Sequence, residues 1–125
     1  MIAADLSPGS VRLLGGVAGA LGAPVETLAC DAAQVPLPTA SVDTVAAIHL
    51  LEHLGTEHCE RALREAIRLA RRRVVVAVPF EHEPTAAYGH IQTFSHADLV
   101  RLGRSQGRRF RVSEHNGGWL VMYAD

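Results

Sequence analysis

The stretch CDAAQVPLPTASVDTVAAIHLLEHL, residues 30–54, decides the fold class of this chain. Its centre, residues 42–48, is apolar on both alternating faces apart from Asp43 and Thr44. Such a run is typical of a strand in a parallel sheet that helices cover on both sides. Asp31 precedes this strand and His49 follows it, so polar side chains lie on either side of a buried element.

Strands and helices alternate along the rest of the chain. We expect strands at residues 2–5, 25–29, 42–48, 74–78, 109–114 and 119–123, and helices at 8–21, 56–70 and 95–107. Asn116-Gly117-Gly118 separates the last two strands and is typical of a hairpin turn. The order predicts an α/β fold with a mostly parallel, open sheet and a C-terminal antiparallel hairpin.

Two local features of the second helix are also predicted. Thr56 is expected to cap its N-terminus. Arg71, Arg72 and Arg73 follow the helix, and positive side chains at a helix C-terminus interact favourably with its dipole.

Composition narrows the class of protein. The chain has 125 residues, is 48% hydrophobic and carries a formal net charge of -1. These values predict one domain over residues 1–125 and give no reason to expect nucleic acid or a membrane surface as partner. No apolar run approaches the roughly 20 residues that span a bilayer, so we expect a cytoplasmic protein. Cys30 and Cys59 lie outside any C-x-x-C pattern and are expected to be ordinary buried residues.

Several motifs resemble one enzyme family. Residues 31–54 combine an acid, a short Leu-Pro turn, a D-x-V strand and the letters LEHL, and Ala4-Asp5-Leu6-Ser7-Pro8 fits a D-x-S-P motif. Together they resemble the class I S-adenosylmethionine-dependent methyltransferases of the type 11 kind. The resemblance implies a Rossmann-like sheet, S-adenosylmethionine as cofactor and a small-molecule or glycan acceptor.

The same resemblance assigns a cofactor site. In that family the acid in the place of Asp5 binds the ribose hydroxyls, and the acid in the place of Asp31 faces the adenine amine, with the Ala32 amide on the ring. Leu6 and His49 are placed in the site in the same way. A carboxylate suits the first role because it accepts two hydrogen bonds. The alternative is that Asp5 caps the next helix and Asp31 starts a turn.

The C-terminal half resembles a narrower branch. Val78-Pro79-Phe80-Glu81, Tyr88-Gly89-His90 and the segment around Trp119 are similar to the methyltransferase associated with mycofactocin, which methylates a glucose hydroxyl. A hydroxyl acceptor benefits from a general base, and histidine is suited to neutral pH. His90 is the first candidate for the catalytic base, followed by His53 and Glu81. A purely structural role for each remains open.

Other functions also fit parts of the sequence. Residues 49–53 spell H-x-x-E-H, the order of one class of zinc peptidase, which would need a third ligand and an open position for water. We nevertheless assign no metal ligands. The family's G-x-G-x-G loop does not precede Asp5, and the first strand is missing. We therefore expect a truncated chain that binds S-adenosylmethionine weakly or not at all. The exposed sheet edges suggest a homodimer or a non-catalytic interaction module.

Overall fold

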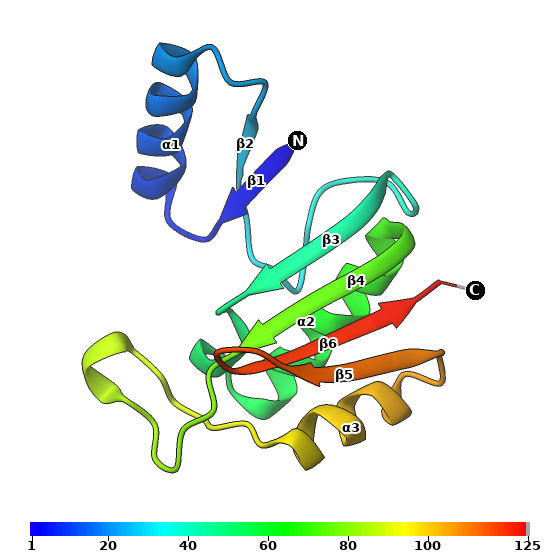
Figure 1. Cartoon of the computed structure of the whole chain (residues 1–125). Helices are drawn as coiled ribbons and strands as arrows, with labels where there is room; N and C mark the ends of the chain where they lie inside the picture. The colour runs from blue at the N-terminus through cyan, green and yellow to red at the C-terminus, as the bar shows by residue number, and fades with distance from the viewer. Residues whose placement is uncertain (125) are drawn as a thin grey trace. The chain divides into compact units, whose positions relative to one another are not determined.

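The computed structural model describes residues 1–124 and divides the chain into two compact units, Met1–Pro36 and Leu37–Asp125 (Figure 1). The larger unit contains the long apolar strand and every histidine of the chain. The expectation of a single domain over residues 1–125 stays a prediction.

The N-terminal unit is a β-α-β element. Strand β1 (Ile2–Asp5) pairs in parallel with β2 (Glu26–Ala29), and helix α1 (Pro8–Leu21) connects them. The helix starts where expected because the Ser7 hydroxyl accepts the N–H of Ser10 at 3.3 Å and Pro8 occupies the first turn. It ends at Gly22, whose φ of +65° is a conformation that favours glycine.

The C-terminal unit contains a mixed four-stranded sheet in the order β3-β4-β6-β5 (Figure 1). Its strands are β3 (Val42–Ile48), β4 (Ala70–Val78), β5 (Phe110–Glu114) and β6 (Gly118–Tyr123). Strands β3 and β4 are parallel, whereas β6 runs antiparallel to both of its neighbours, β4 and β5. The expected α/β class and the C-terminal antiparallel hairpin are therefore confirmed, and the sheet that carries the hairpin is mixed, with one parallel and two antiparallel pairings.

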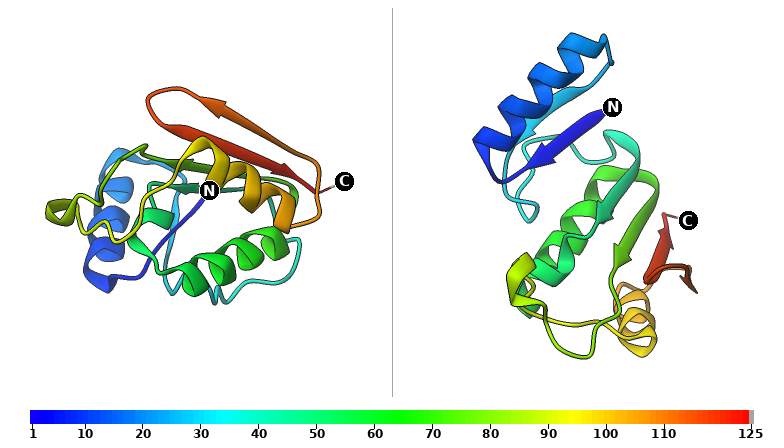
Figure 2. Two further views of the ribbon diagram at one scale, coloured as in Figure 1. Left: turned by 90° about the horizontal axis from the view of Figure 1, so that it is seen from below. Right: turned by 60° about the vertical axis from the view of Figure 1, so that its left-hand side comes forward.

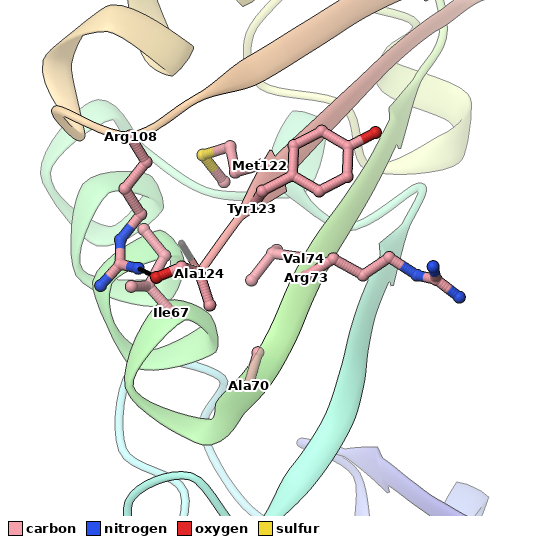
Figure 3. A pocket seen from close by; sticks show the side chains of 8 residues that line it. All are labelled: Ile67, Ala70, Arg73, Val74, Arg108, Met122, Tyr123 and Ala124. Atoms are coloured by element: carbon pink, nitrogen blue, oxygen red, sulfur yellow. Dashed lines mark hydrogen bonds between the residues drawn. The ribbon is translucent and has the colours of Figure 1, made fainter.

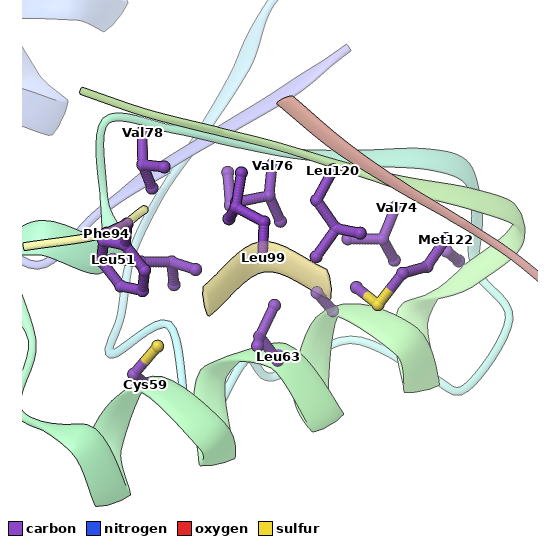
Figure 4. Close-up of a cluster of buried hydrophobic side chains, with 13 residues drawn as sticks. Leu51, Cys59, Leu63, Val74, Val76, Val78, Phe94, Leu99, Leu120 and Met122 are labelled. Carbon is purple, nitrogen blue, oxygen red and sulfur yellow. The ribbon is translucent and has the colours of Figure 1, made fainter. Parts of the chain in front are cut away.

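Helices α2 (Thr56–Leu69) and α3 (His96–Ser105) both cover one face of this sheet (Figure 2). Leu63 from α2 and Leu99 from α3 meet strand side chains such as Val76 and Leu120, and all four are almost completely buried (Figure 4). Burial of such side chains stabilises the fold by about 1.5 to 3 kcal/mol each. Two short 3-10 helices, η1 (Leu51–His53) and η2 (Ala86–Tyr88), complete the unit.

Two predictions about α2 were wrong. Thr56 is the first helical residue, and the preceding Gly55 takes the capping position without a side-chain hydrogen bond. The three arginines lie in β4 and not at the helix terminus, because Ala70 is already extended and pairs with Val42 at the start of the strand. Pairing with β3 thus begins directly after the last helical turn.

The glycine-rich hairpin also allows close packing against the sheet. A Cβ atom on Gly118 would overlap with the side chains of Phe80 and Leu99. The glycine therefore lets the start of the long connection after β4 lie against the sheet. Within residues 1–124, none of the helices combines the length and the apolar character that crossing a bilayer requires.

Candidate functional site

One cluster of ionisable side chains forms directly after β3. The strand ends at Ile48, and His49 takes a positive φ of +52°, which turns the chain sharply into η1. Glu52 and His53 belong to this short helix. In open α/β sheets, ligands bind beyond the carboxyl ends of parallel strands. The cluster therefore lies at the edge of the sheet where a site is expected.

The connection from β4 to α3 folds back onto η1. The backbone amides of Ile91 and Gln92 donate to the Glu52 carbonyl oxygen at 2.8 and 3.3 Å. The Gln92 side-chain amide donates to the Leu51 carbonyl at 3.1 Å and also to that of Leu54. These bonds hold the neighbouring His90 next to residues that are far away in the sequence.

The carboxylate of Glu52 lies at the centre of the cluster. Its side chain is only 1% exposed, and neither oxygen accepts a hydrogen bond from any described residue. Three histidine nitrogens lie within 4.0 Å of Oε1: His49 Nδ1 at 3.4 Å, His53 Nε2 at 3.8 Å and His90 Nε2 at 4.0 Å. A buried carboxylate without a donor is unusual, because an unpaired buried polar group costs free energy.

A second carboxylate, that of Glu81, orients His90. The His90 Nδ1 atom lies 2.9 Å from Oε2 and 3.0 Å from Oε1 of Glu81, and the Thr85 hydroxyl donates to Oε1 at 2.7 Å. The hydrogen bond from Thr85, followed by the one from His90, lowers the pKa of Glu81 below its ordinary value of 4.5. Glu81 is therefore an ionised acceptor at neutral pH.

His53 is oriented by the backbone. Its Nδ1 atom lies 3.1 Å from the carbonyl oxygen of Gly89, whose φ of +73° is a conformation that favours glycine. The rings of His53 and His90 meet edge to face, with centroids 4.9 Å apart. The structure therefore brings together the three candidates for the catalytic base, His90, His53 and Glu81, around Glu52.

The two expected cofactor acids lie together in the N-terminal unit. Asp5 pairs with Ala29 at the carboxyl end of the β1-β2 sheet, and Asp31 follows two residues after Ala29. Asp5 Oδ1 accepts the Ser7 N–H, and Asp31 Oδ1 accepts the Ala33 N–H, each at 2.8 Å.

Both acids thus make the local turn contacts that the alternative interpretation required. A carboxylate has about four acceptor positions, so the backbone contact of Asp5 leaves capacity for a ligand. Leu6 is largely exposed and Ala32 is half-buried, next to the two acids in the sequence. The cofactor roles of Asp5, Leu6, Asp31, Ala32 and His49 stay predictions.

Sequence reasoning missed the importance of Glu52 and assigned no metal ligands. Ligand atoms of Glu52, His53 and His90 lie within 4.8 Å of one another, a spacing that can hold a metal ion. The peptidase interpretation would instead use His49 and His53 as ligands and Glu52 as a base. The H-x-x-E-H spelling of residues 49–53 was the signal in the sequence that pointed toward this arrangement.

A small hollow lies at the other end of the larger sheet. Arg73, Arg108 and Tyr123 contribute to its lining, and Arg108 donates to the Ala124 carbonyl at 3.1 Å (Figure 3). Its volume of about 10 Å³ is far below the roughly 300 to 1,000 Å³ of ligand pockets. It also lies at the amino end of β4, which argues against a ligand site.

The chain belongs to the methyltransferase domain family, whose sequence model matches residues 1–78. The match covers both expected cofactor acids and the whole of η1. A search of curated proteins found no match.

Solved structures confirm the Rossmann-like fold. Magnesium protoporphyrin IX methyltransferase from Synechocystis, with bound S-adenosylhomocysteine, superimposes with a TM-score of 0.74 at 17% identity, covering 99% of this chain and 64% of that protein. A SAM-dependent methyltransferase from Aquifex aeolicus gives 0.74 at 20% identity, covering 98% and 66%. The chain thus spans slightly less than two thirds of the length of either protein.

The fold alone does not determine the reaction. The [4+2]-cyclase SpnF also superimposes, with a TM-score of 0.72 at 21% identity over 90% of this chain and 43% of that protein. One sheet therefore supports different chemistries, and the reaction must be argued from the side chains of the site. The expected cofactor agrees with the family and with the bound ligand of the Synechocystis structure.

Proposed function

We propose that this chain carries out S-adenosylmethionine-dependent methyl transfer to a hydroxyl of a small molecule or glycan. Membership of the methyltransferase domain family supports the transfer. The observation that carries the hydroxyl acceptor is the His90–Glu81 pair at 2.9 Å, since a hydroxyl must lose its proton during the reaction.

Asp5 and Asp31 are the residues proposed to hold the cofactor. Both carboxylates follow the carboxyl ends of adjacent parallel strands, a position that suits a nucleoside. Asp5 would accept hydrogen bonds from the ribose, whereas Asp31 and the Ala32 amide would contact adenine. The resemblance to the family adds Leu6 and His49 to the residues proposed to bind the cofactor. When bound, S-adenosylmethionine supplies the methyl group as an electrophile.

His90 is the proposed general base. Because Glu81 can only accept at Nδ1, the neutral His90 ring carries its proton there and has a lone pair at Nε2. That lone pair is the atom that would take the proton of the acceptor hydroxyl. The neutral His53 ring also carries its proton on Nδ1, because that atom faces the Gly89 carbonyl. His53 is therefore the second candidate for the general base.

A sugar hydroxyl is the acceptor we favour. The residues that resemble the mycofactocin-associated branch, Glu81 and Tyr88-Gly89-His90, are those that build the cluster. A glucose hydroxyl on an oligosaccharide is accordingly the first substrate to test.

The test measures transfer of a labelled methyl group to a glucose oligosaccharide at millimolar cofactor, because we expect weak cofactor affinity. Replacing a general base costs about 10²- to 10⁴-fold in rate, so His90→Gln should lose at least 100-fold. His96→Gln is the matched control, because His96 pairs with Glu114 at an exposed position. Equal rates in both variants would remove His90 as the base, and no transfer in the wild type would refute the proposal.

Cofactor binding is measured separately by calorimetry. Asp5→Asn and Asp31→Asn should weaken binding about tenfold each, whereas Asp43→Asn, at an exposed ion pair with Arg71, should not. Micromolar binding by the wild type would refute the expectation of weak affinity.

A non-catalytic module is the second candidate. Among described residues, β1 pairs only with β2 and β3 only with β4, so each leaves one edge without a neighbour. Such edges can add a strand from another chain. A stable homodimer in sedimentation, combined with no cofactor binding, would favour this function.

A further inference from the structure

We infer that Glu52, His53 and His90 form a binding site for one divalent cation of the zinc type. Each residue offers one ligand atom, and these atoms lie within 4.8 Å of one another. Two imidazoles and one carboxylate form a ligand set that proteins use for zinc in sites with an open position.

The orientation of both histidines supports this inference. His53 Nδ1 faces the Gly89 carbonyl oxygen and His90 Nδ1 faces the Glu81 carboxylate, and both oxygens can only accept. The proton of each neutral ring therefore lies on Nδ1. The two Nε2 lone pairs then point toward the same atom, Oε1 of Glu52, at 3.8 and 4.0 Å.

The distances fit a shared cation better than direct hydrogen bonds. A hydrogen bond needs about 2.7 to 3.2 Å, so none joins Glu52 to these rings. Two ligands at about 2.1 Å from one tetrahedral zinc ion lie about 3.4 Å apart. The distances of 3.8 and 4.0 Å exceed this value by only about half an ångström, so a modest inward movement of the rings would complete the site.

The burial of Glu52 is an independent observation. Its side chain is 1% exposed, and both of its oxygens lack a hydrogen-bond donor among residues 1–124. An isolated carboxylate in such a place costs several kcal/mol unless a positive charge compensates it. Neutral imidazoles, including that of His49 with Nδ1 at 3.4 Å from Oε1, do not supply that charge, whereas a divalent cation does.

The surroundings resemble the outer shell of known metal centres. Ligating histidines almost always donate their second ring N–H to a carboxylate or a backbone carbonyl, which fixes the ring. His90 has the first kind of partner in Glu81, and His53 has the second in Gly89. Thr85 in turn fixes Glu81.

This inference deepens the proposed function and rests on it for the role of the ion. With three protein ligands, the cation has an open position for the oxygen of the acceptor hydroxyl, whose pKa it would lower. In the metal-bound chain His90 would be a ligand, so water would take the hydroxyl proton, whereas in the metal-free chain the His90 Nε2 lone pair is available as the general base.

The experiment titrates Zn²⁺ into the full chain after removal of metal with a chelator, without cofactor or acceptor. Calorimetry should show one ion per chain. Glu52→Gln, His53→Gln and His90→Gln should each weaken binding at least tenfold, and so should Glu81→Gln, because it orients a ligand. His96→Gln and Glu114→Gln are matched controls from an exposed pair. Co²⁺ supplies a spectroscopic readout, since its visible absorption should appear in the wild type and be lost in the Glu52 variant.

Circular dichroism establishes that each variant is folded. The inference is overturned if the wild type binds no Zn²⁺, or if the control variants lose as much affinity as the cluster variants. Binding of Zn²⁺ without any S-adenosylmethionine binding would leave the metal site intact and refute the methyltransferase function. Cofactor binding without Zn²⁺ binding would refute the metal site and leave the methyltransferase function intact.

Discussion

The acids of the two units differ in how their oxygens are used. Asp5 and Asp31 accept backbone N–H groups from their own turns at 2.8 Å, whereas Glu52 is buried and accepts none among the described residues. A carboxylate that closes a turn contributes to local structure whether or not a ligand binds. Glu52 makes no such contribution, so its burial indicates function more strongly than the position of either aspartate.

Metal binding gives the largest expected difference between the two regions. At a hundredfold excess over its dissociation constant, Zn²⁺ should stabilise the folded chain by about 2.7 kcal/mol, which raises the Tm of a unit of this size by roughly 10 °C or more. Glu52→Gln should remove this shift, and Asp31→Asn should retain it. An equal rise in Tm on adding Zn²⁺ to both variants, measured by differential scanning calorimetry, would contradict this expected difference.

Without metal, the two kinds of acid should respond to substitution with opposite signs. Glu52→Gln replaces an uncompensated carboxylate by a neutral amide and should raise the free energy of unfolding by about 1 to 3 kcal/mol. Asp31→Ala removes the bond to Ala33 and should lower it by about 1 kcal/mol. Urea unfolding after chelation measures both. Destabilisation by Glu52→Gln would mean that Glu52 instead pairs with protonated histidines.

The cysteines provide a probe for each unit. Cys59 is 3% exposed and packs in the core with Leu51, whereas Cys30 is only half-buried, so the expected burial is confirmed for Cys59 alone. Burial, and to a lesser degree the charge of Glu60, raises the pKa of the Cys59 thiol from 9.0 to about 11.

The neutral thiol is therefore favoured in the folded state, while the unfolded chain ionises above pH 9.0. Stability from this group is fully present below pH 9 and is lost as the pH rises toward about 11, at about 1.4 kcal/mol per pH unit. Cys59→Ala should flatten this alkaline slope in unfolding curves, and Cys30→Ala should not. An unchanged slope in Cys59→Ala would assign the effect to other groups.

The smallest expected effect concerns Glu81 at acid pH. Its pKa is lowered in the folded state, so its contribution to stability is present above pH 4.5 and is lost as the pH falls through the folded value. Glu81→Gln should remove this part of the loss of stability at acid pH. Thr85→Val should move it toward higher pH, because the Thr85 hydrogen bond is the largest cause of the shift. The same dependence of stability on acid pH in the wild type and both variants would contradict the assignment of this effect to Glu81.

Local patterns in the sequence predicted most of the fold. The limits of β1 and β3 were correct, because short apolar runs with polar ends have few alternatives. Ser95, where the third helix was expected to begin, is the N-cap of α3, because Ser95 and Asp98 form a reciprocal capping box. The beginning of β4 was wrong, because pairing with β3 overrides the apparent helix end.

The candidate site was only partly predictable. Histidine and acid types identified His53, His90 and Glu81 as candidates, but their convergence depends on hydrogen bonds from Ile91 and Gln92 to η1. Such long-range contacts leave no periodic signal in a single sequence. The importance of Glu52 became apparent only from its burial and its lack of donors.

Because Gln92 is hydrogen-bonded to η1, the number of residues before it determines where His90 lies. His90 stands two residues before this anchor, and one added or deleted residue between them would rotate its ring away while the sheet stayed intact. Among related chains, the length of this loop should therefore separate those that keep the chemistry from those that keep only the scaffold.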